Sequence, residues 1–298
     1  MLSILLRALR VHQWSKNALL LVPLVASHQL WPLDWVPGAL LALGAFSGVA
    51  SSAYLVNDLL DVEADRAHPT KRGRPIASGA LAPGVALALA AAVCALGLAL
   101  GALLGLRFLG ALGVYLVLTL AYSLLLKRVA LLDVIVLASL YTLRVIAGHI
   151  AFDIPYSEWL LAFTVFLFLG LALLKRYGEL LLLRQAGAAA AAAAGNRRGY
   201  APHDAELVAY LGTSSSFIAA LVFALYINSS QVRELYRHPD LLWLAVPVLL
   251  YWLGRLWRIA HHSEMDADPV LFALRDGASY LVGGLLLAVL LAASGVVR

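Results

Sequence analysis

Residues 39–66 read ALLALGAFSGVASSAYLVNDLLDVEADR, an apolar segment that ends in a dense group of acids. The apolar part has the length of roughly 20 residues that a helix needs to cross the hydrocarbon core of a bilayer. At its end, Asp58, Asp61 and Asp65 are spaced by three and then four residues, so a helix would present them on one face. The stretch therefore predicts a membrane-spanning helix with an acidic end.

Composition extends this prediction to the whole chain. Hydrophobic residues make up 62% of the 298 residues, charged residues only 13%, and the mean hydropathy is +0.87, which excludes an ordinary soluble globular protein. We expect an all-α integral membrane protein that forms a single membrane domain over residues 1–298. Nine apolar segments are predicted to span the membrane, near residues 18–36, 39–59, 81–105, 108–126, 130–151, 157–175, 205–228, 240–258 and 278–296.

The distribution of Lys and Arg predicts the orientation. Most of the 22 basic residues fall in loops on the same side as the acidic motif, and cytoplasmic loops are the ones enriched in Lys and Arg. We expect a multi-pass protein of the inner (cell) membrane, with the N-terminus and the acidic motif cytoplasmic and the C-terminus outside. The net charge of +5 then reflects orientation, so no nucleic-acid partner is predicted. A cleavable signal peptide is not expected, and the single cysteine, Cys94, allows no disulfide within the chain.

The acidic motif predicts a metal site. Carboxylates are the hard oxygen ligands that Mg²⁺ prefers, so Asp58, Asp61 and Asp65 are the expected metal ligands and the expected catalytic centre. The alternative is a solvated acidic helix end. The basic loop that follows contains Lys71 and Arg74, and it favours the site, because cations beside a metal suit a phosphorylated substrate. These cations could equally act as topology signals.

Further polar groups are predicted on the same side of the membrane. Alternatives remain open for several of them: Lys16 could be an interface anchor, Lys175 and Glu179 could form an intrahelical salt bridge, and Arg144 lies inside a predicted span, where ionisable residues usually face a polar cavity and bind an anion or a carboxylate. The expected substrate-binding residues are Lys16, Asn57, Lys71, Arg74, Tyr122, Lys127, Arg144, Lys175, Arg176, Glu179, Asp268, Arg275 and Asp276.

The motifs resemble those of the UbiA superfamily of intramembrane prenyltransferases. The resemblance rests on Asn57-Asp58-x-x-Asp61-x-x-x-Asp65 followed by Arg74-Pro75 and Ser78-Gly79, and it extends over nearly the whole chain. It implies a helical bundle around a central cavity, capped by cytoplasmic loops that carry the acidic motif, and a Mg²⁺-dependent transfer reaction. The usual activity in this superfamily is transfer of a prenyl group from a diphosphate to an aromatic acceptor.

One departure from the superfamily pattern narrows the expectation. Most members carry a second DxxxD motif after the sixth span, where this chain has Lys175-Arg176-Tyr177-Gly178-Glu179. The chain is similar in this respect to the branch of decaprenyl-phosphate phosphoribosyltransferases. The resemblance implies transfer of a 5-phosphoribosyl group from phosphoribosyl pyrophosphate to a polyprenyl phosphate, with release of pyrophosphate, for cell-envelope polysaccharide synthesis.

Two alternatives to this function remain. An ordinary UbiA-type enzyme would move a prenyl group to an aromatic quinone precursor, which the first motif alone permits. A transporter would carry ionisable residues near the bilayer midplane, and only Arg144 fits that expectation. The sequence also leaves open whether the chain forms a homo-oligomer.

Overall fold

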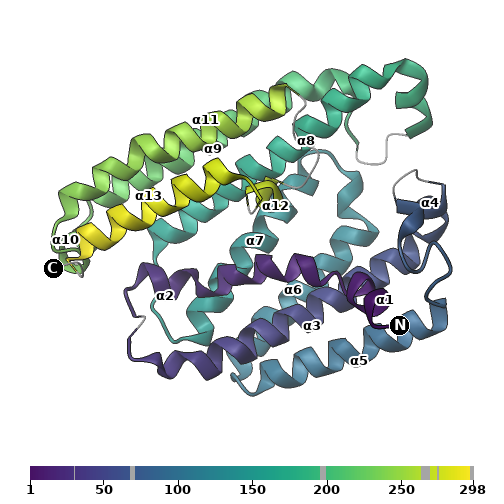
Figure 1. The fold of residues 1–298 in the computed structure, drawn as a ribbon, viewed down its shortest axis with the longest axis horizontal. Coiled ribbons are helices and arrows are strands. Elements are labelled where there is room, and N and C mark those ends of the chain that lie inside the picture. The colour runs from purple at the N-terminus through teal and green to yellow at the C-terminus, as the bar shows by residue number, and fades with distance from the viewer. Residues whose placement is uncertain (30, 68–70, 195–198, 263–268, 274, 296–298) are drawn as a thin grey trace. The chain divides into compact units, whose positions relative to one another are not determined.

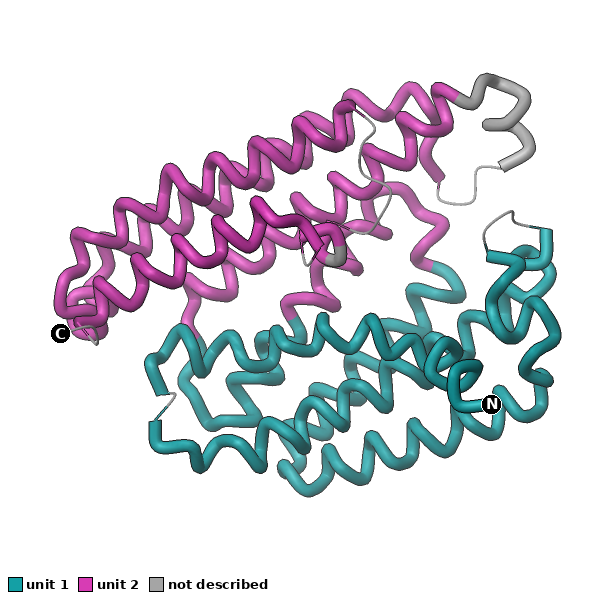
Figure 2. Tube along the Cα trace, in the orientation of Figure 1, with its two compact units in different colours: residues 1–125, 143–156 teal, residues 126–142, 157–298 magenta. Residues whose placement is uncertain are grey.

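Every regular element in the described part of the chain is a helix (Figure 1). The structure is a computed structural model that describes residues 1–298 apart from residues 30, 68–70, 195–198, 263–268, 274 and 296–298. The chain divides into two compact units, residues 1–125 with 143–156 and residues 126–142 with 157–298 (Figure 2). Helix α7, Leu132–Ala151, contributes its first part to unit 2 and its last part to unit 1.

Unit 1 holds the N-terminal half of the chain and the acidic motif. Besides the end of α7, its helices are α1 (Leu2–Ala8), η1 (Val11–Leu21), α2 (Val22–Ala26), η2 (Leu33–Trp35), α3 (Val36–Leu60), α4 (Val62–Arg66), η3 (Lys71–Gly73), α5 (Pro83–Ala102) and α6 (Leu106–Leu124).

Unit 2 holds the remaining helices. Besides the start of α7, they are η4 (Leu126–Arg128), α8 (Glu158–Ala194), η5 (Pro202–Asp204), α9 (Ala205–Ile227), α10 (Ser230–Leu235), η6 (Pro239–Leu244), α11 (Ala245–His261), α12 (Pro269–Ala273) and α13 (Gly277–Ser294).

Eight helical segments of the described chain are long and apolar enough to cross a membrane. They correspond to eight of the nine predicted spans. The predicted span at 18–36 is not confirmed: this stretch contains the end of η1, the short helix α2, the turn that follows it, η2 and the first residue of α3. Pro23 and Pro32 limit regular helix here, and His28 has a positive φ of 58°.

Glycine allows α3 and α5 to pack closely in unit 1. A Cβ atom on Gly48 would lie 2.8 Å from the carbonyl oxygen of Val93, and one on Gly97 would lie 2.8 Å from that of Ala45. Such close backbone approach through small residues is typical of membrane helices. At the end of α3 that carries the acids, Leu55 and Ile76 belong to a buried apolar cluster. This cluster fixes the basic loop against α3.

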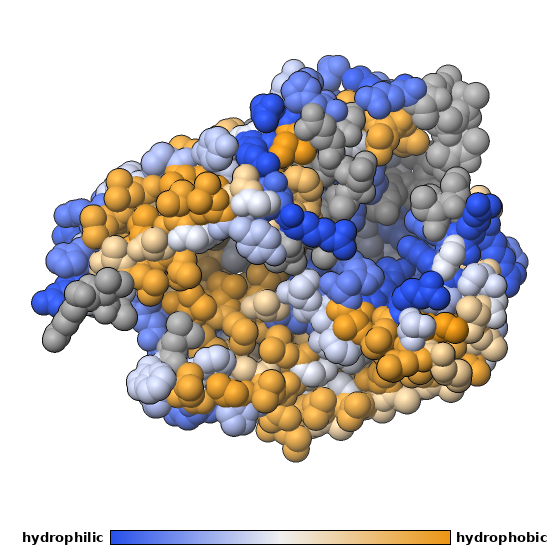
Figure 3. Space-filling view, in the orientation of Figure 1, coloured by the Kyte–Doolittle hydropathy of each residue, from blue (hydrophilic) through white to orange (hydrophobic). Residues whose placement is uncertain are grey.

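The apolar surface of each unit agrees with a membrane environment. Figure 3 shows apolar side chains along α13 in unit 2 and along α3 and α5 in unit 1, while hydrophilic residues gather around α4. Large side chains such as Leu87, Leu96 and Leu281 are at least 60% exposed. With several helices apolar over their outer faces as well, the chain is an integral membrane protein.

Candidate active site

The acidic motif lies where α3 ends and α4 begins. Asp58 is in the last turn of α3, Asp61 lies between the two helices, and Asp65 is in α4. The carboxylates of Asp58 and Asp65 are buried, with exposed residue fractions of 4% and 3%, whereas Asp61 is half-buried. The helix break thus folds two acids of the motif inward at one end of unit 1.

Two arginines neutralise these buried acids. Arg74 Nη1 donates to Asp58 Oδ1 at 3.0 Å and to Asp65 Oδ2 at 2.6 Å. Arg10, from the turn between α1 and η1, donates to Asp58 Oδ1 at 2.5 Å. Buried carboxylates require such partners because an uncompensated charge is costly to remove from water. Arg10 was not among the candidates from the sequence.

The donor set of the motif fits Mg²⁺. Asp58, Asp61 and Asp65 supply only hard carboxylate oxygens, and Asp58 and Asp65 already contact one common cationic nitrogen. In the structure this position belongs to Arg74, and no group of three or more acidic, His or Cys side chains within the described chain is assembled as a metal site. The fit therefore rests on ligand chemistry and on two acids sharing one cation.

Three more unit 1 candidates surround the same end of α3 or lie in neighbouring helices. Asn57 is in α3 beside Asp58, and Lys71 begins η3 in the basic loop. Tyr122 lies near the end of α6. All three side chains are half-buried. Their roles toward a substrate stay predictions.

Arg144 and Lys16 are both buried in unit 1. Arg144, buried in α7, donates from Nε to Asn17 Oδ1 at 3.0 Å and from Nη2 to the Tyr115 hydroxyl at 2.8 Å. Its guanidinium also stacks over the Tyr115 ring. These partners are neutral, so the contacts described differ from the anion or carboxylate expected for Arg144. Lys16 is buried in η1, which an exposed interface anchor would not be.

In unit 2, Arg176 forms a buried ionic network. Its Nη2 lies 2.8 Å from Asp133 Oδ2, and its Nη1 pairs with Glu179. Asp133 Oδ1 also accepts a hydrogen bond from the Tyr200 hydroxyl, and the two oxygens lie 2.6 Å apart. Burial, together with this hydrogen bond, raises the pKa of Tyr200 well above its usual range. The Arg176 side chain is only 2% exposed, so it acts within the protein, and its predicted role as a phosphate ligand finds no support in these contacts.

Lys127 and Lys175 are the other basic candidates of unit 2. Lys127 belongs to the short helix η4, and Lys175 to α8 next to Arg176. Both side chains are half-buried. Glu179, the expected partner of Lys175, pairs with Arg176 three residues away.

Asp276 has a structural position. It accepts two hydrogen bonds from Arg255, at 2.6 and 2.9 Å, and caps the N-terminus of α13 by accepting from the Ser279 backbone N–H at 2.8 Å. None of these contacts points to a substrate, and the expectation that Asp276 binds substrate stays a prediction. Arg275 is exposed beside it, and Asp268 lies outside the described residues.

The bonds from Arg255 and Ser279 hold the pKa of Asp276 below its usual range. The ionised form is therefore favoured by folding, and the stabilisation is present above the ordinary pKa and lost as pH falls through the lowered one.

We expect Asp276→Asn, which keeps the cap, to lower the unfolding free energy by about 1–2 kcal/mol at pH 7. Thermal unfolding in detergent between pH 7 and 3 measures it. The deficit should shrink below a pH of about 4. The exposed Asp240→Asn is the control. A deficit that is independent of pH would contradict this role.

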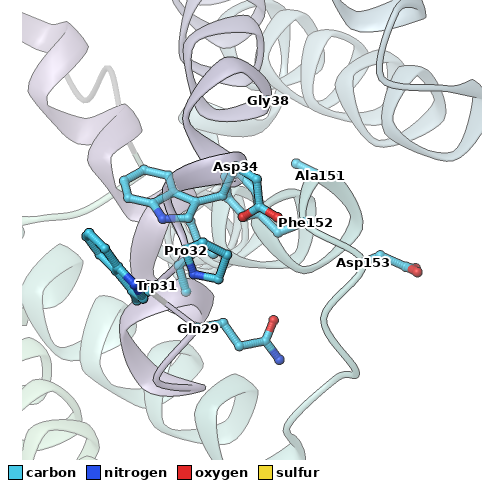
Figure 4. A pocket seen from close by; sticks show the side chains of 10 residues that line it. Gln29, Trp31, Pro32, Asp34, Gly38, Ala151, Phe152 and Asp153 are labelled. Carbon is cyan, nitrogen blue, oxygen red and sulfur yellow. The ribbon is translucent and has the colours of Figure 1, made fainter. Parts of the chain in front are cut away.

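A separate cavity of about 520 Å³ lies at the other end of α3. Figure 4 shows Trp31 and Asp153 on opposite sides of it, with Gly38 of α3 above them in the view. Gly38 and Asp58 are 20 residues apart on one helix, hence about 30 Å apart at 1.5 Å per residue. This cavity is therefore not part of the acidic site.

Of the two residues that the sequence analysis missed, Asp133 and Arg10, only the first carries a recognisable signal. Asp133 lies inside a predicted span, as Arg144 does, and an ionisable residue in a span indicates a buried partner. Arg10 carries no such signal, because a basic residue before a span is also what the positive-inside rule predicts. Its contact with Asp58 joins residues 48 positions apart and depends on the fold.

The fold and the acidic site define a helical integral membrane protein with a carboxylate-rich centre at the end of one span. A model of the UbiA prenyltransferase family matches residues 19–280, and the chain belongs to this family. Membership of a family of transferases argues against the transporter alternative.

Several relatives share most of this chain. It is 33% identical to a decaprenyl-phosphate phosphoribosyltransferase of Mycolicibacterium smegmatis, over 93% of this chain and 87% of the relative. It is also 33% identical to the nodulation protein NoeC of Azorhizobium caulinodans, over 91% of this chain and 87% of that relative. An uncharacterized protein, y4nM of Sinorhizobium fredii, is 38% identical over 94% of this chain, which spans only 54% of that relative.

Solved structures agree with the fold. A UbiA homologue from Archaeoglobus fulgidus, bound to GPP and Mg²⁺, has a TM-score of 0.69 at 18% identity. The match covers 96% of this chain and 99% of the homologue. The same homologue with DMAPP and Mg²⁺ gives a TM-score of 0.70.

Proposed function

We propose that this protein transfers a 5-phosphoribosyl group from phosphoribosyl pyrophosphate to a polyprenyl phosphate of the decaprenyl type, releasing pyrophosphate, in the synthesis of a cell-envelope polysaccharide precursor. The observation that carries the proposal is the pairing of one acidic motif with guanidinium groups at Asp58 and Asp65. Acids for one metal beside cations for phosphate suit a donor with a pyrophosphate group.

The α8 segment supports the same reaction. Where a second acidic motif would bind another metal, α8 carries the half-buried Lys175, and the neighbouring Arg176 is paired with Asp133. Two phosphorylated substrates bring more negative charge than a prenyl diphosphate with an aromatic acceptor. Fewer acids and more cations are then expected. Relatives at 33% identity that are named decaprenyl-phosphate phosphoribosyltransferases add to this support.

In the proposed mechanism, Asp58, Asp61 and Asp65 would hold Mg²⁺, which when bound neutralises the pyrophosphate leaving group. Lys71 and Arg74 hold the phosphate oxygens of the donor. Guanidinium makes bidentate contacts, and ammonium acts as a point charge.

The bond from the ribose anomeric carbon to pyrophosphate breaks with its electron pair going to the leaving oxygen. The acceptor phosphate oxygen forms the new bond to the same carbon. This oxygen is already ionised, so the chain needs no strong general base. Asn57 and Tyr122 are our candidates for orienting the ribose or a phosphate oxygen.

Lys127 and Lys175 are the proposed phosphate ligands of unit 2. We expect Lys175→Asp to raise the KM for phosphoribosyl pyrophosphate by about tenfold or more, because it replaces an attractive charge with a repulsive one. Steady-state kinetics at saturating acceptor measure the change. An unchanged KM would mean that Lys175 serves only membrane topology.

The proposal is tested by giving the purified protein two alternative substrate pairs with Mg²⁺. We expect product with phosphoribosyl pyrophosphate and a polyprenyl phosphate, and none with a prenyl diphosphate and an aromatic acid. The opposite result would assign an ordinary UbiA-type prenyl transfer. The proposed setting is a multi-pass inner-membrane protein whose acidic site faces the cytoplasm, where a soluble phosphorylated donor is available.

A further inference from the structure

A metal held by Asp58 and Asp65 would compete with Arg74 for their oxygens. Arg74 Nη1 contacts Asp58 Oδ1 and Asp65 Oδ2 together, at 3.0 and 2.6 Å. A cation that bridges two carboxylates takes such a position. Placing a divalent ion beside a guanidinium on the same oxygens would bring like charges together. The guanidinium must therefore leave these oxygens when a metal binds there.

Arg10 competes for Asp58 as well. Its Nη2 lies 2.5 Å from the oxygen that Arg74 also contacts, and its guanidinium carbon lies 4.9 Å from the centre of the Tyr54 ring. The backbone of Arg10 has φ 50° and ψ 47°, the left-handed conformation that non-glycine residues rarely adopt. Such conformations persist where the surroundings enforce them, and they are concentrated at functional sites.

The segment that carries Arg10 is attached to one face of α3. Trp14 Nε1 donates to Ser51 Oγ at 3.0 Å, and Asn17 Nδ2 donates to Ser47 Oγ at 3.0 Å. Ser47 and Ser51 are four residues apart, so they share a face of α3. These bonds do not involve the Arg10 side chain. The segment can therefore keep Arg10 near the acids after the ion pair with Asp58 opens.

We propose that Arg10 and Arg74 exchange partners when the donor binds: their guanidinium groups leave Asp58 and Asp65 to the metal and take up the pyrophosphate oxygens of the donor. Arg10 is thereby assigned as a donor-binding residue. The inference rests on the proposed function insofar as it requires a metal and a pyrophosphate group. Metal and pyrophosphate then bind cooperatively, because the displaced arginines gain a new anionic partner only when pyrophosphate is present.

The exchange predicts opposite effects of one substitution. Without pyrophosphate, Arg10→Gln should tighten binding of Mn²⁺, used as a spectroscopically visible substitute for Mg²⁺, because one competitor for Asp58 is gone. With Mn²⁺ in excess, the same variant should bind the Mn²⁺–pyrophosphate complex more weakly. We expect the affinity for Mn²⁺ to rise by about tenfold and the affinity for Mn²⁺–pyrophosphate to fall by about tenfold, which is within the usual range of coupling between ligands. The two affinities are measured on the full chain in detergent, by electron paramagnetic resonance and by calorimetry.

Arg66→Gln is the matched control. Arg66 follows Asp65, but its Nε donates to the Ala77 carbonyl oxygen at 3.2 Å. Its loss removes the same charge from the same end of unit 1, so both affinities should stay within about twofold if simple electrostatics is a minor effect. Arg10→Lys keeps the charge and should show smaller shifts with the same signs. It replaces Arg10→Gln if that variant fails to fold.

Weaker Mn²⁺ binding by the Arg10 variant, or unchanged binding of Mn²⁺–pyrophosphate, would overturn the exchange. Equal shifts in the Arg66 variant would also overturn it, because charge alone would then account for them. Phosphoribosyl pyrophosphate is tested separately at excess Mn²⁺. If it does not bind while Mn²⁺–pyrophosphate shows the opposite shifts, the exchange stands and the proposed donor is wrong.

Discussion

Replacing Asp61 with Asn is expected to lower kcat at least about 100-fold while the protein remains folded in the membrane. Loss of residues that merely support a metal ligand costs 10–100-fold, so loss of a ligand should cost no less. Asp61 is half-buried between α3 and α4, and the change to Asn keeps the size and shape of its side chain while removing the charge that a metal needs. Turnover at saturating Mg²⁺ and substrates measures the effect.

Glu63→Gln is the matched control for Asp61→Asn. Glu63 lies two residues further on, in α4, and is exposed. The Glu63→Gln change removes the same charge from the same motif and should leave kcat within about twofold of that of the natural protein, as expected for a solvated acid. Near-normal turnover of Asp61→Asn would remove Asp61 from the metal site. An equal loss in both variants would point to the overall charge of the motif.

Replacing Asp133 with Asn is expected to lower the free energy of unfolding by about 3–5 kcal/mol. Asp133 is fully buried and faces Arg176, which is itself 2% exposed. Without the carboxylate, the buried Arg176 charge keeps its pair with Glu179, which is about two-fifths exposed and shields it poorly, and its position over the Tyr200 ring. Denaturation in mixed micelles, monitored by the helical signal, measures the loss.

Glu206→Gln is the control for Asp133→Asn. Glu206 pairs with Arg184 at 3.5 Å in the same unit, but both side chains are largely exposed. Exposed pairs contribute between about 0 and 1 kcal/mol, so this variant should unfold nearly like the natural protein. If Asp133→Asn were equally mild, Arg176 would be available to a substrate, and its predicted role in phosphate binding would regain support.

The fold was predictable because its signal is strong and local. Eight of nine spans could be located from apolar segments of sufficient length, since a membrane requires every backbone polar group to be bonded within a helix. The span predicted at 18–36 is not confirmed, and the reason is again physical. That stretch is apolar, but its prolines and the turn at Ser27–Gln29 divide it, and apolar length alone does not register such breaks.

The site was predictable in its acids and less so in its cations. The spacing of Asp58 and Asp65 predicted that they lie close together, and the structure holds them on one common cation, although a break at Asp61 places them in two helices. Arg176 and Asp276 illustrate the limit. Each was assigned to substrate from its position in a charged cluster, yet each binds a partner distant in sequence, Asp133 or Arg255. A linear pattern contains the charge of a residue but not the partner that the fold provides.

The central claim is that the ribosyl carbon of the donor moves to the lipid while its pyrophosphate does not. Phosphoribosyl pyrophosphate labelled with ¹⁴C in the ribose and with ³²P in the β-phosphate is incubated with the purified protein, Mg²⁺ and a polyprenyl phosphate, and the lipid is extracted. We predict ¹⁴C in the lipid and ³²P in the aqueous phase, with neither label extracted after chelation or with Asp61→Asn. Both labels remaining aqueous with the natural protein would contradict the account, and ³²P in the lipid would indicate transfer of the wrong group.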